Sequence, residues 1–312
     1  MKTRITELLK IRYPIIQGAM YPVSASASLV AAVSEGGGLG IVEAAKMTPD
    51  ELRKTIRGIK EKTEKPCGIN LIPEAEHLEE LLDTMIAEQV PVFSYGIGNP
   101  KHIIDKAKEA GLITIPTVGS VRHAVKAERD GAEAIIVQGT EAGGHASFVS
   151  TMVLVPLVVE RVKIPVVAAG GIGDARGLVA AFALGADGIS MGTRFIATKE
   201  SPAHPRAKQK LLESCEEDTI VTRSVTGVRA RAIKNKLTEA YLDSSSTNDR
   251  RGLLKGVSKI SAAYCDGDVE NGSVAAGQVC GLIDDIPTCH ELMERIINGA
   301  IPVLEDVKGK TS

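Results

Sequence analysis

Eight short apolar runs recur along the chain up to residue 192, and segments with helical signals separate them. Short apolar runs bounded by glycine, proline or polar residues are typical of strands that are buried on both faces. Strands of this kind that alternate with helices indicate a parallel sheet. The number of repeats favours an α/β fold of the closed (β/α)8 TIM barrel type over a doubly wound open sheet, which stays the alternative. The runs cover residues 14–18, 38–42, 67–72, 91–95, 113–118, 134–138, 165–169 and 188–192.

Helix-start signals stand between several of these runs. Thr48 is a typical N-cap residue, and Pro49 suits the first position of a helix. Asn99-Pro100 and Ser120 open two further segments in the same way. Apolar residues at helical spacing then occupy 121–129 and 175–184.

The pattern changes after about residue 203, where helical stretches follow one another without intervening strands. We therefore expect a barrel over 1–203, a small helical lobe over 204–285 beside its C-terminal mouth, and a returning helix over 286–305 that completes the barrel. A polar loop is expected at 243–249, and residues 306–312 are expected to fray. Within this region helices are predicted over 206–215, 229–242, 251–264, 273–282 and 288–300.

Composition excludes several classes of function. The net charge is −2 and aromatic residues make up 3% of the chain, so nucleic-acid binding is not expected. There is no apolar run of membrane-spanning length and no signal-peptide pattern at the start. The five cysteines are scattered and odd in number, which favours free thiols in a reducing cytoplasm over disulfides or zinc. We expect a cytoplasmic protein with a small-molecule substrate, and a homodimer stays open.

Three glycine-rich loops follow the ends of predicted strands. They are Gly139–Gly144, Gly170-Gly171 and Gly192-Thr193. In barrel enzymes the active site lies at the C-terminal ends of the strands, and the loops after the last two strands frequently bind phosphate. Glycine lets backbone N–H groups approach phosphate oxygens closely. The loops predict a phosphate-bearing ligand, which could be flavin mononucleotide (FMN), a sugar phosphate or another compound.

His145 stands at the end of the first of these loops, where a proton could be moved. A lone histidine is usually a structural residue, but its place beside two glycines favours function. Asn70 and Gln138 end two strands, and neutral amides suit hydrogen bonding to a flat heterocycle. Gly18-Ala19-Met20 ends the first strand and could lie along a ring face. The other histidines give no credible metal spacing.

Several motifs give the chain a family resemblance. Glu141–His145 and Ala168–Ile172 are the most specific of them, and they resemble the flavin-dependent family of nitronate monooxygenases (2-nitropropane dioxygenases) and flavin-dependent enoyl-acyl-carrier-protein reductases. Segments 3–15, 192–195, 231–235 and 267–278 look most like the reductases.

This resemblance implies a barrel that binds FMN, NADH or NADPH as reductant, and a lobe that covers a small-molecule or acyl-carrier substrate. It also implies that His145 is the acid–base residue. The residues that would bind FMN are Gly18, Ala19, Met20, Asn70, Gln138, Gly143, Gly144, Gly170, Gly171, Ser190, Met191, Gly192 and Thr193.

Two departures leave the reaction open. Reductases of this type usually carry Glu where Gln138 stands, whereas the monooxygenases carry Gln. The segment Ala146-Ser147-Phe148 lacks the glycine that both groups place two positions after the histidine. Reduction of an enoyl thioester, oxidation of an alkyl nitronate with dioxygen, and binding of a phosphorylated metabolite without redox chemistry are therefore all retained as hypotheses.

Overall fold

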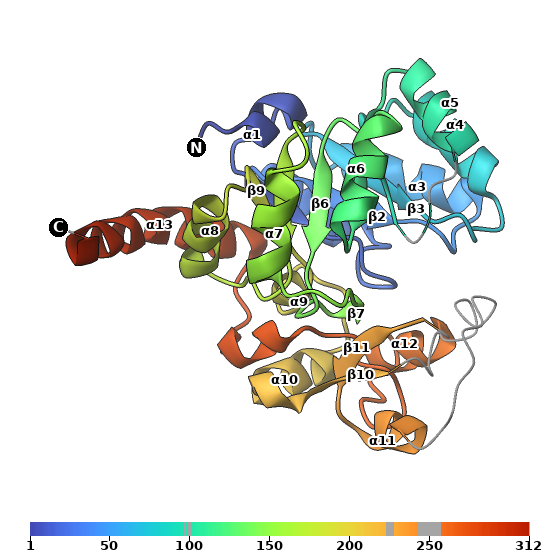
Figure 1. Cartoon of the computed structure of the whole chain (residues 1–312). Coiled ribbons are helices and arrows are strands. Elements are labelled where there is room, and N and C mark those ends of the chain that lie inside the picture. Colours follow the sequence, from blue (N-terminus) through green and yellow to red (C-terminus); the bar gives the residue numbers. More distant parts are fainter. Residues whose placement is uncertain (97, 99–100, 223–227, 243–256, 312) are drawn as a thin grey trace.

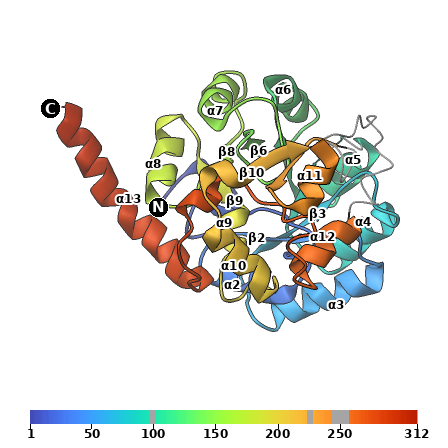
Figure 2. The same ribbon diagram turned by 90° about the horizontal axis from the view of Figure 1, so that it is seen from below.

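The computed structural model describes residues 1–96, 98, 101–222, 228–242 and 257–311. Within this part of the chain, eight parallel strands pair in the order β1-β9-β8-β6-β5-β4-β3-β2. A parallel bridge between Ile16 and Leu39 joins the two ends of this order, so the sheet closes on itself (Figures 1 and 2). The predicted TIM barrel is confirmed. Its strands are Ile15–Gln17 (β1), Gly40–Glu43 (β2), Cys67–Leu71 (β3), Val92–Tyr95 (β4), Ile113–Val118 (β5), Ile135–Gln138 (β6), Val166–Ala169 (β8) and Gly188–Met191 (β9).

Helices between the strands surround the barrel. The side chain of Thr48 accepts a hydrogen bond from the Glu51 N–H and Pro49 opens the next helix, while Ser120 caps another by accepting from His123 N–H, as predicted. The expected start at Asn99-Pro100 lies outside the described residues. The helices are Ala27–Glu35 (α2), Pro49–Lys60 (α3), Leu78–Ala87 (α4), Lys101–Glu109 (α5), Val121–Arg129 (α6), Thr151–Val159 (α7), Ala175–Ala183 (α8) and Thr193–Ile196 (α9).

Two layers of apolar side chains hold the barrel together. Inside it, aliphatic residues such as Ile16, Ile41 and Ile136 pack on one another, and Ile5 and Leu9 of helix α1 (Arg4–Leu9) join the same cluster from the chain start. Outside it, side chains of the opposite strand faces pack against the helices. This is the period-two alternation that barrel strands require. Each fully buried aliphatic side chain contributes roughly 1.5–3 kcal/mol.

The segment 204–285, called the lobe below, is not purely helical. Strands β10 (Thr219–Thr222) and β11 (Ala230–Ile233) form an antiparallel sheet with β7 (Gly144–His145). The predicted helix over 229–242 is therefore wrong in its first part, because backbone groups of 230–233 pair across this sheet. Only helix α11 (Lys236–Leu242) remains of it. The other elements are α10 (Pro205–Glu213), a 3₁₀ turn (Glu216–Asp218), α12 (Val257–Tyr264) and a second 3₁₀ turn (Gln278–Leu282).

The predicted helix over 273–282 is also wrong. Its backbone N–H groups are used in tertiary contacts: Gly277 donates to Thr193 Oγ1 at 2.9 Å, and Gln278 donates to Glu141 O at 3.0 Å. Only the 3₁₀ turn remains of the expected helix. The polar loop at 243–249 and the start of the helix predicted over 251–264 lie outside the described residues.

The returning helix α13 (Cys289–Thr311) packs on α8 and α2 and then projects from the body (Figure 1). The expectation that it would fray from residue 306 is wrong, since the helix continues to Thr311 and the Lys310 ammonium pairs with the Asp306 carboxylate at 2.6 Å. None of the described helices is both long and apolar enough to cross a bilayer. The division into a barrel over 1–203 and a lobe stays a prediction.

Candidate functional site

The predicted site residues gather at one rim of the barrel. Gln138 pairs in register with Ala169, and Ala169 with Ser190, so three of the loops start side by side. A methyl group added to Gly18 would meet Ser190 Oγ at 3.4 Å, and one added to Gly192 would meet Met20 Sδ at 3.3 Å. The structure thus brings together the ends of β1, β6, β8 and β9. Figure 1 shows the lobe against this rim, next to β7 and α9.

The two loops predicted to bind phosphate contain backbone donors without partners among the described residues. Gly170 and Gly171 adopt φ values of 104° and 72°, a left-handed backbone that favours glycine. Among the hydrogen bonds of the described residues, none is donated by the N–H groups of Gly171, Gly192 or Thr193. Backbone N–H groups without partners in glycine loops are suitable donors to an anion.

The loop with His145 is held in place from the lobe. His145 pairs with Ala230 and Gly144 with Arg231, while Ala146 N–H donates to Arg229 O at 3.1 Å. From the barrel, the Gln138 side-chain amide donates to the carbonyl of His145. The backbone of the histidine is therefore fixed by both parts of the chain.

Glu141 anchors the same loop to the barrel, a role that sequence analysis missed. Its carboxylate accepts from Thr151 N–H at 3.0 Å and from Thr151 Oγ1 at 2.9 Å. The Thr151 hydroxyl also lies 3.0 Å from Gly170 O. On the lobe side, Gly143 packs so closely that an added methyl group would stand 2.6 Å from the carbonyl carbon of Ala276. The sequence motif contains Glu141, but the motif does not indicate that Thr151 is its hydrogen-bond partner.

The His145 side chain is buried at one of its ring nitrogens. Nε2 is buried and has no hydrogen-bond partner in the described structure. Burial lowers the pKa of His145 from its ordinary value of 6.5 to about 4, because desolvation disfavours the imidazolium. The imidazole is consequently neutral at pH 7. Beside it, the position of Gly144 opens onto free space, with no atom within 4 Å of where a methyl group would stand.

A carboxylate that sequence analysis also missed lies across the same rim. Glu43 ends β2 and pairs in register with Asn70, whose side-chain amide donates to Ser94 Oγ at 3.2 Å. Glu43 is buried; one carboxyl oxygen accepts from Ala45 N–H at 3.2 Å and the other has no partner among the described residues. Burial raises the pKa of Glu43 to about 7. The only signal in the sequence is an acidic residue directly after an apolar run.

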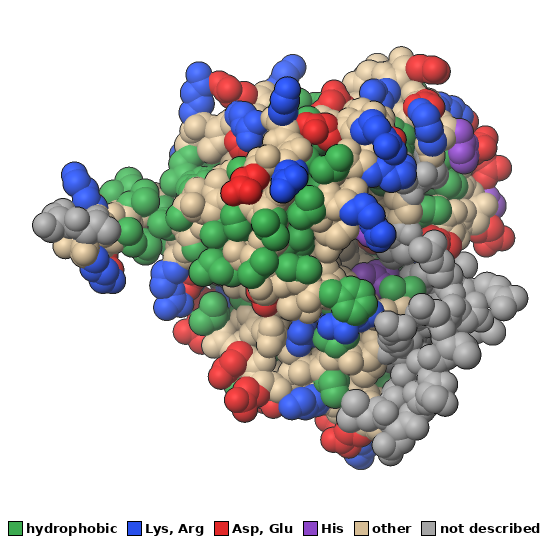
Figure 3. Space-filling model, viewed as in Figure 1, with side chains coloured by type: hydrophobic (Ala, Val, Ile, Leu, Met, Phe, Trp, Pro, Cys, Tyr) green, Lys and Arg blue, Asp and Glu red, His purple; other side chains and the backbone are tan. Residues whose placement is uncertain are grey.

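An arginine and an aromatic ring flank the His145 loop. The guanidinium of Arg229 lies 4.6 Å from the ring centroid of Phe148, which is 72% exposed. The buried Nε of Arg229 has no partner among the described residues. Exposed apolar side chains continue over α7, at Met152, Val153 and Leu157 (Figure 3).

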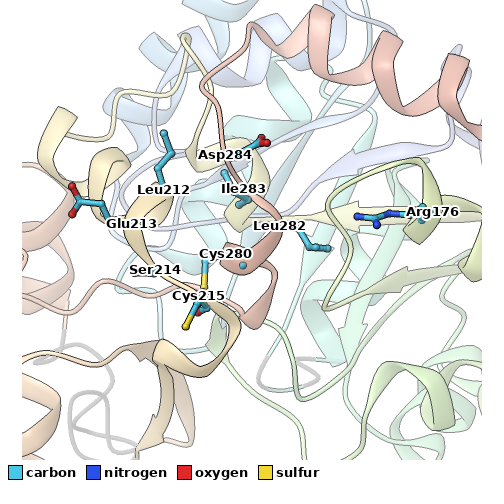
Figure 4. A pocket seen from close by; sticks show the side chains of 10 residues that line it. Arg176, Leu212, Glu213, Ser214, Cys215, Cys280, Leu282, Ile283 and Asp284 are labelled. Atoms are coloured by element: carbon cyan, nitrogen blue, oxygen red, sulfur yellow. Dashed lines mark hydrogen bonds between the residues drawn. The ribbon is translucent and has the colours of Figure 1, made fainter.

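The remaining histidines lie elsewhere. His77 pairs with Glu80 at 2.7 Å, and His204 caps α10 by accepting from Arg206 N–H at 3.1 Å. The described ranges contain no group of side chains that could hold a metal ion. A cavity of about 470 Å³ lies between α8 and the lobe and includes Arg176, Cys215 and Cys280 (Figure 4). It contains none of the predicted site residues.

The residues at the rim fit a flat polar ring with a phosphate tail. Unpartnered N–H groups lie at Gly171, Gly192 and Thr193, and unpartnered buried polar atoms lie at Glu43 and His145. Buried polar groups without partners cost free energy and are therefore rare unless a ligand satisfies them. FMN has both kinds of complementary group. The binding roles of these residues stay predictions.

Comparison with known proteins shows which family the chain resembles over most of its length. A family model described as nitronate monooxygenase matches residues 2–87 and 74–299. The chain is 36% identical over 347 residues to (3aS,4S,5R,7aS)-5-hydroxy-7a-methyl-1-oxo-octahydro-1H-indene-4-carboxyl-CoA dehydrogenase of Mycobacterium tuberculosis, with 98% of each chain covered. It is 38% identical over 348 residues to a probable nitronate monooxygenase of Staphylococcus aureus strain JH9, with 95% of this chain and 97% of that one covered.

A solved structure extends the likeness to three dimensions. FabK from Thermotoga maritima superposes with a TM-score of 0.94 at 41% identity, and the match covers 99% of each chain. These relatives are oxidoreductases, and the chain is an enzyme of that class. Sequence motifs, barrel and relatives agree over nearly the whole length, and the chain belongs to the nitronate monooxygenase family.

Proposed function

We propose that the protein is an FMN-dependent oxidoreductase that reduces the carbon–carbon double bond of an acyl thioester, with NADH or NADPH as the electron source. The main support for this proposal is the imidazole of His145, which is neutral at pH 7 and whose Nε2 has no hydrogen-bond partner among the described residues. It lies beside three glycine loops at one rim of the barrel. Two relatives support a thioester substrate: the Mycobacterium tuberculosis dehydrogenase is named for a CoA thioester, and FabK is an enoyl-acyl-carrier-protein reductase.

The N–H groups of Gly171, Gly192 and Thr193 would bind the phosphate of FMN. The ring would lie toward Gly18, Met20, Asn70 and Gln138, with Gly143, Gly144 and Ser190 close to it. When bound, FMN supplies hydride transfer between the reductant and the substrate carbon. The lobe over 204–285 would cover the substrate and exclude water. A cytoplasmic location and a homodimer stay predictions.

His145 would act on the substrate as a neutral group. With Nε2 protonated, the ring can donate a hydrogen bond to the thioester carbonyl; with Nε2 free, it can accept a proton or position a water molecule. Because its pKa is about 4, His145 is unprotonated at pH 7 and cannot act there as an imidazolium acid. We therefore assign it to carbonyl polarisation and to placing the water that protonates the neighbouring carbon.

A nitronate monooxygenase is the second candidate, and Gln138 favours it. The monooxygenases carry Gln at this position, and the Staphylococcus aureus relative is named for that activity. In that reaction neutral His145 would serve as the base or as the partner of the anionic nitronate. Its unpartnered nitrogen meets this requirement too.

Paired assays separate the two candidates. Under anaerobic conditions NADH oxidation is followed with crotonyl-CoA or an enoyl-acyl-carrier protein; in air, oxygen uptake is followed with propyl nitronate. Turnover in the first assay supports our proposal, and turnover only in the second overturns it in favour of the monooxygenase. Purified protein without bound FMN would contradict both candidates and support the third hypothesis, a phosphate-binding barrel without redox chemistry.

A His145→Gln variant tests the assigned residue. It should retain FMN and lose turnover by roughly 10²–10³-fold, the usual cost of losing one positioned group that polarises a carbonyl. His102→Gln is the matched control, since His102 lies exposed on α5. Equal turnover in the two variants would refute the role of His145.

A further inference from the structure

Glu43 has a buried carboxyl group at the end of a barrel strand whose other inward side chains are aliphatic. Leu39 and Ile41 pack in the aliphatic cluster inside the barrel, whereas Val42 packs with Leu52 in the cluster outside it. Because side chains of a strand alternate between the two faces, Glu43 belongs to the inward set. It is the last residue of β2 and lies on the rim where the predicted site residues meet.

A polar row begins at this position. Glu43 pairs in register with Asn70, and Asn70 pairs with Ser94 and donates to its hydroxyl at 3.2 Å. These three residues lie at or one residue before the ends of adjacent strands, and they replace the aliphatic layer below them. Asn70 is among the residues that the family resemblance assigns to FMN binding, so Glu43 stands beside the expected cofactor site.

One oxygen of Glu43 is left unsatisfied. Only 8% of the residue is exposed, Oε1 accepts from Ala45 N–H, and Oε2 is buried without a partner in the described structure. Such an atom is expected to receive a partner from a ligand. The carboxyl group also stays protonated up to a higher pH than an ordinary glutamate, since burial raises its pKa to about 7.

We propose that Glu43 is a cofactor-contacting residue that binds the flavin ring as a neutral carboxylic acid. The O–H would donate to an acceptor on the ring, and ionisation would remove that donor and place a negative charge beside the ring. The idea rests on the proposed function, because it requires FMN at this rim. Glu43 would add a contact to FMN that depends on its protonation, and it is not among the residues that the sequence motifs assign to FMN binding.

Among the described residues, one charged side chain acts on the pKa of Glu43. Lys46, on the loop that follows β2, is the charged side chain that lowers its pKa, although burial outweighs it. Of the elements packed on β2, strand β3 begins with Cys67 and helix α2 ends with Glu35, both at the opposite end of the barrel. Glu74, in the loop after β3, is another carboxylate with a buried, unpartnered oxygen.

The test is the pH dependence of FMN binding by the holoenzyme. FMN released on dilution is measured by its fluorescence between about pH 7 and pH 9, where the cofactor phosphate is already ionised and His145 is neutral throughout. If binding requires protonated Glu43, the wild-type affinity falls by about fivefold from pH 7 to pH 8 and by about tenfold from pH 8 to pH 9. Glu43→Gln keeps a neutral polar group, so its affinity should not change with pH.

Matched variants make the result decisive. Glu74→Gln should keep the wild-type slope. A Glu43→Gln protein that binds FMN with the wild-type slope would overturn the proposal, and so would a wild-type affinity that is constant from pH 7 to pH 9. The second result needs no variant to fold. Wild-type protein that binds no FMN at any pH would instead overturn the proposed function and this inference with it.

Discussion

Glu43 and His145 should act on stability in opposite directions over the same range of pH. Folding raises the pKa of Glu43 from 4.5 to about 7. The group contributes stability that is fully present below pH 4.5 and is lost as the pH rises to 7, because the unfolded chain releases the proton first. At roughly 1.4 kcal/mol for each pH unit of separation, the loss is about 3 kcal/mol. The Glu43→Gln variant should not show this loss of stability, because glutamine does not ionise.

His145 produces the reverse effect. Folding lowers its pKa from 6.5 to about 4. Between these pH values, His145 is therefore protonated in the unfolded chain and neutral in the folded one. Stability therefore falls by about 3 kcal/mol as the pH drops from 6.5 to 4. The two contributions nearly cancel between pH 4.5 and 6.5 in the wild-type protein, and each single variant should reveal the slope of the remaining group.

Urea unfolding of FMN-free protein, followed by circular dichroism from about pH 4.5 to 7.5, measures these slopes. FMN is removed because a ligand that binds only the folded state adds its own stabilisation. Relative to wild type, Glu43→Gln should gain stability as the pH rises and His145→Gln as it falls. The double variant should return to the wild-type profile. Differences from wild type that stay constant with pH would refute the assigned pKa directions.

Two further predictions concern the glycine loops. Gly143→Ala places a methyl group 2.6 Å from the backbone of Ala276 and should destabilise the protein by about 1–3 kcal/mol in urea unfolding; an unchanged midpoint would contradict the close packing of loop and lobe. Gly171→Ala forces a side chain onto a backbone with φ of 72° and should weaken FMN retention, whereas Gly111→Ala, at φ 77° in a loop away from the rim, should not; equal retention would argue against a phosphate site at Gly171.

The barrel could be predicted because its signals are local. Each strand is a short apolar run, and residues such as Thr48 and Ser120 mark helix starts by side-chain hydrogen bonds within one turn. The rim followed from topology, since parallel strands must end on the same side. Once the runs were identified, Asn70, Gln138 and the glycine loops could be assigned to one place.

The lobe and Glu43 could not be predicted in this way. Strand β11 pairs with Gly144 and His145, far away in the chain, and its short sequence fits a helix equally well when that partner is unknown. Glu43 directly follows an apolar run and looks like the first polar residue of a loop. Its inward orientation depends on the true strand end and on closure of the barrel, neither of which the local pattern contains.

The pairing of β7 with β11 makes the position of His145 depend on the lobe. His145 sits on a strand whose hydrogen bonds belong partly to the lobe. A displacement of β11 would break these hydrogen bonds and leave the His145 carbonyl held from the barrel by the Gln138 side-chain amide. If His145 acts as proposed, the lobe would therefore have to be in place for the imidazole to be held in its reactive position.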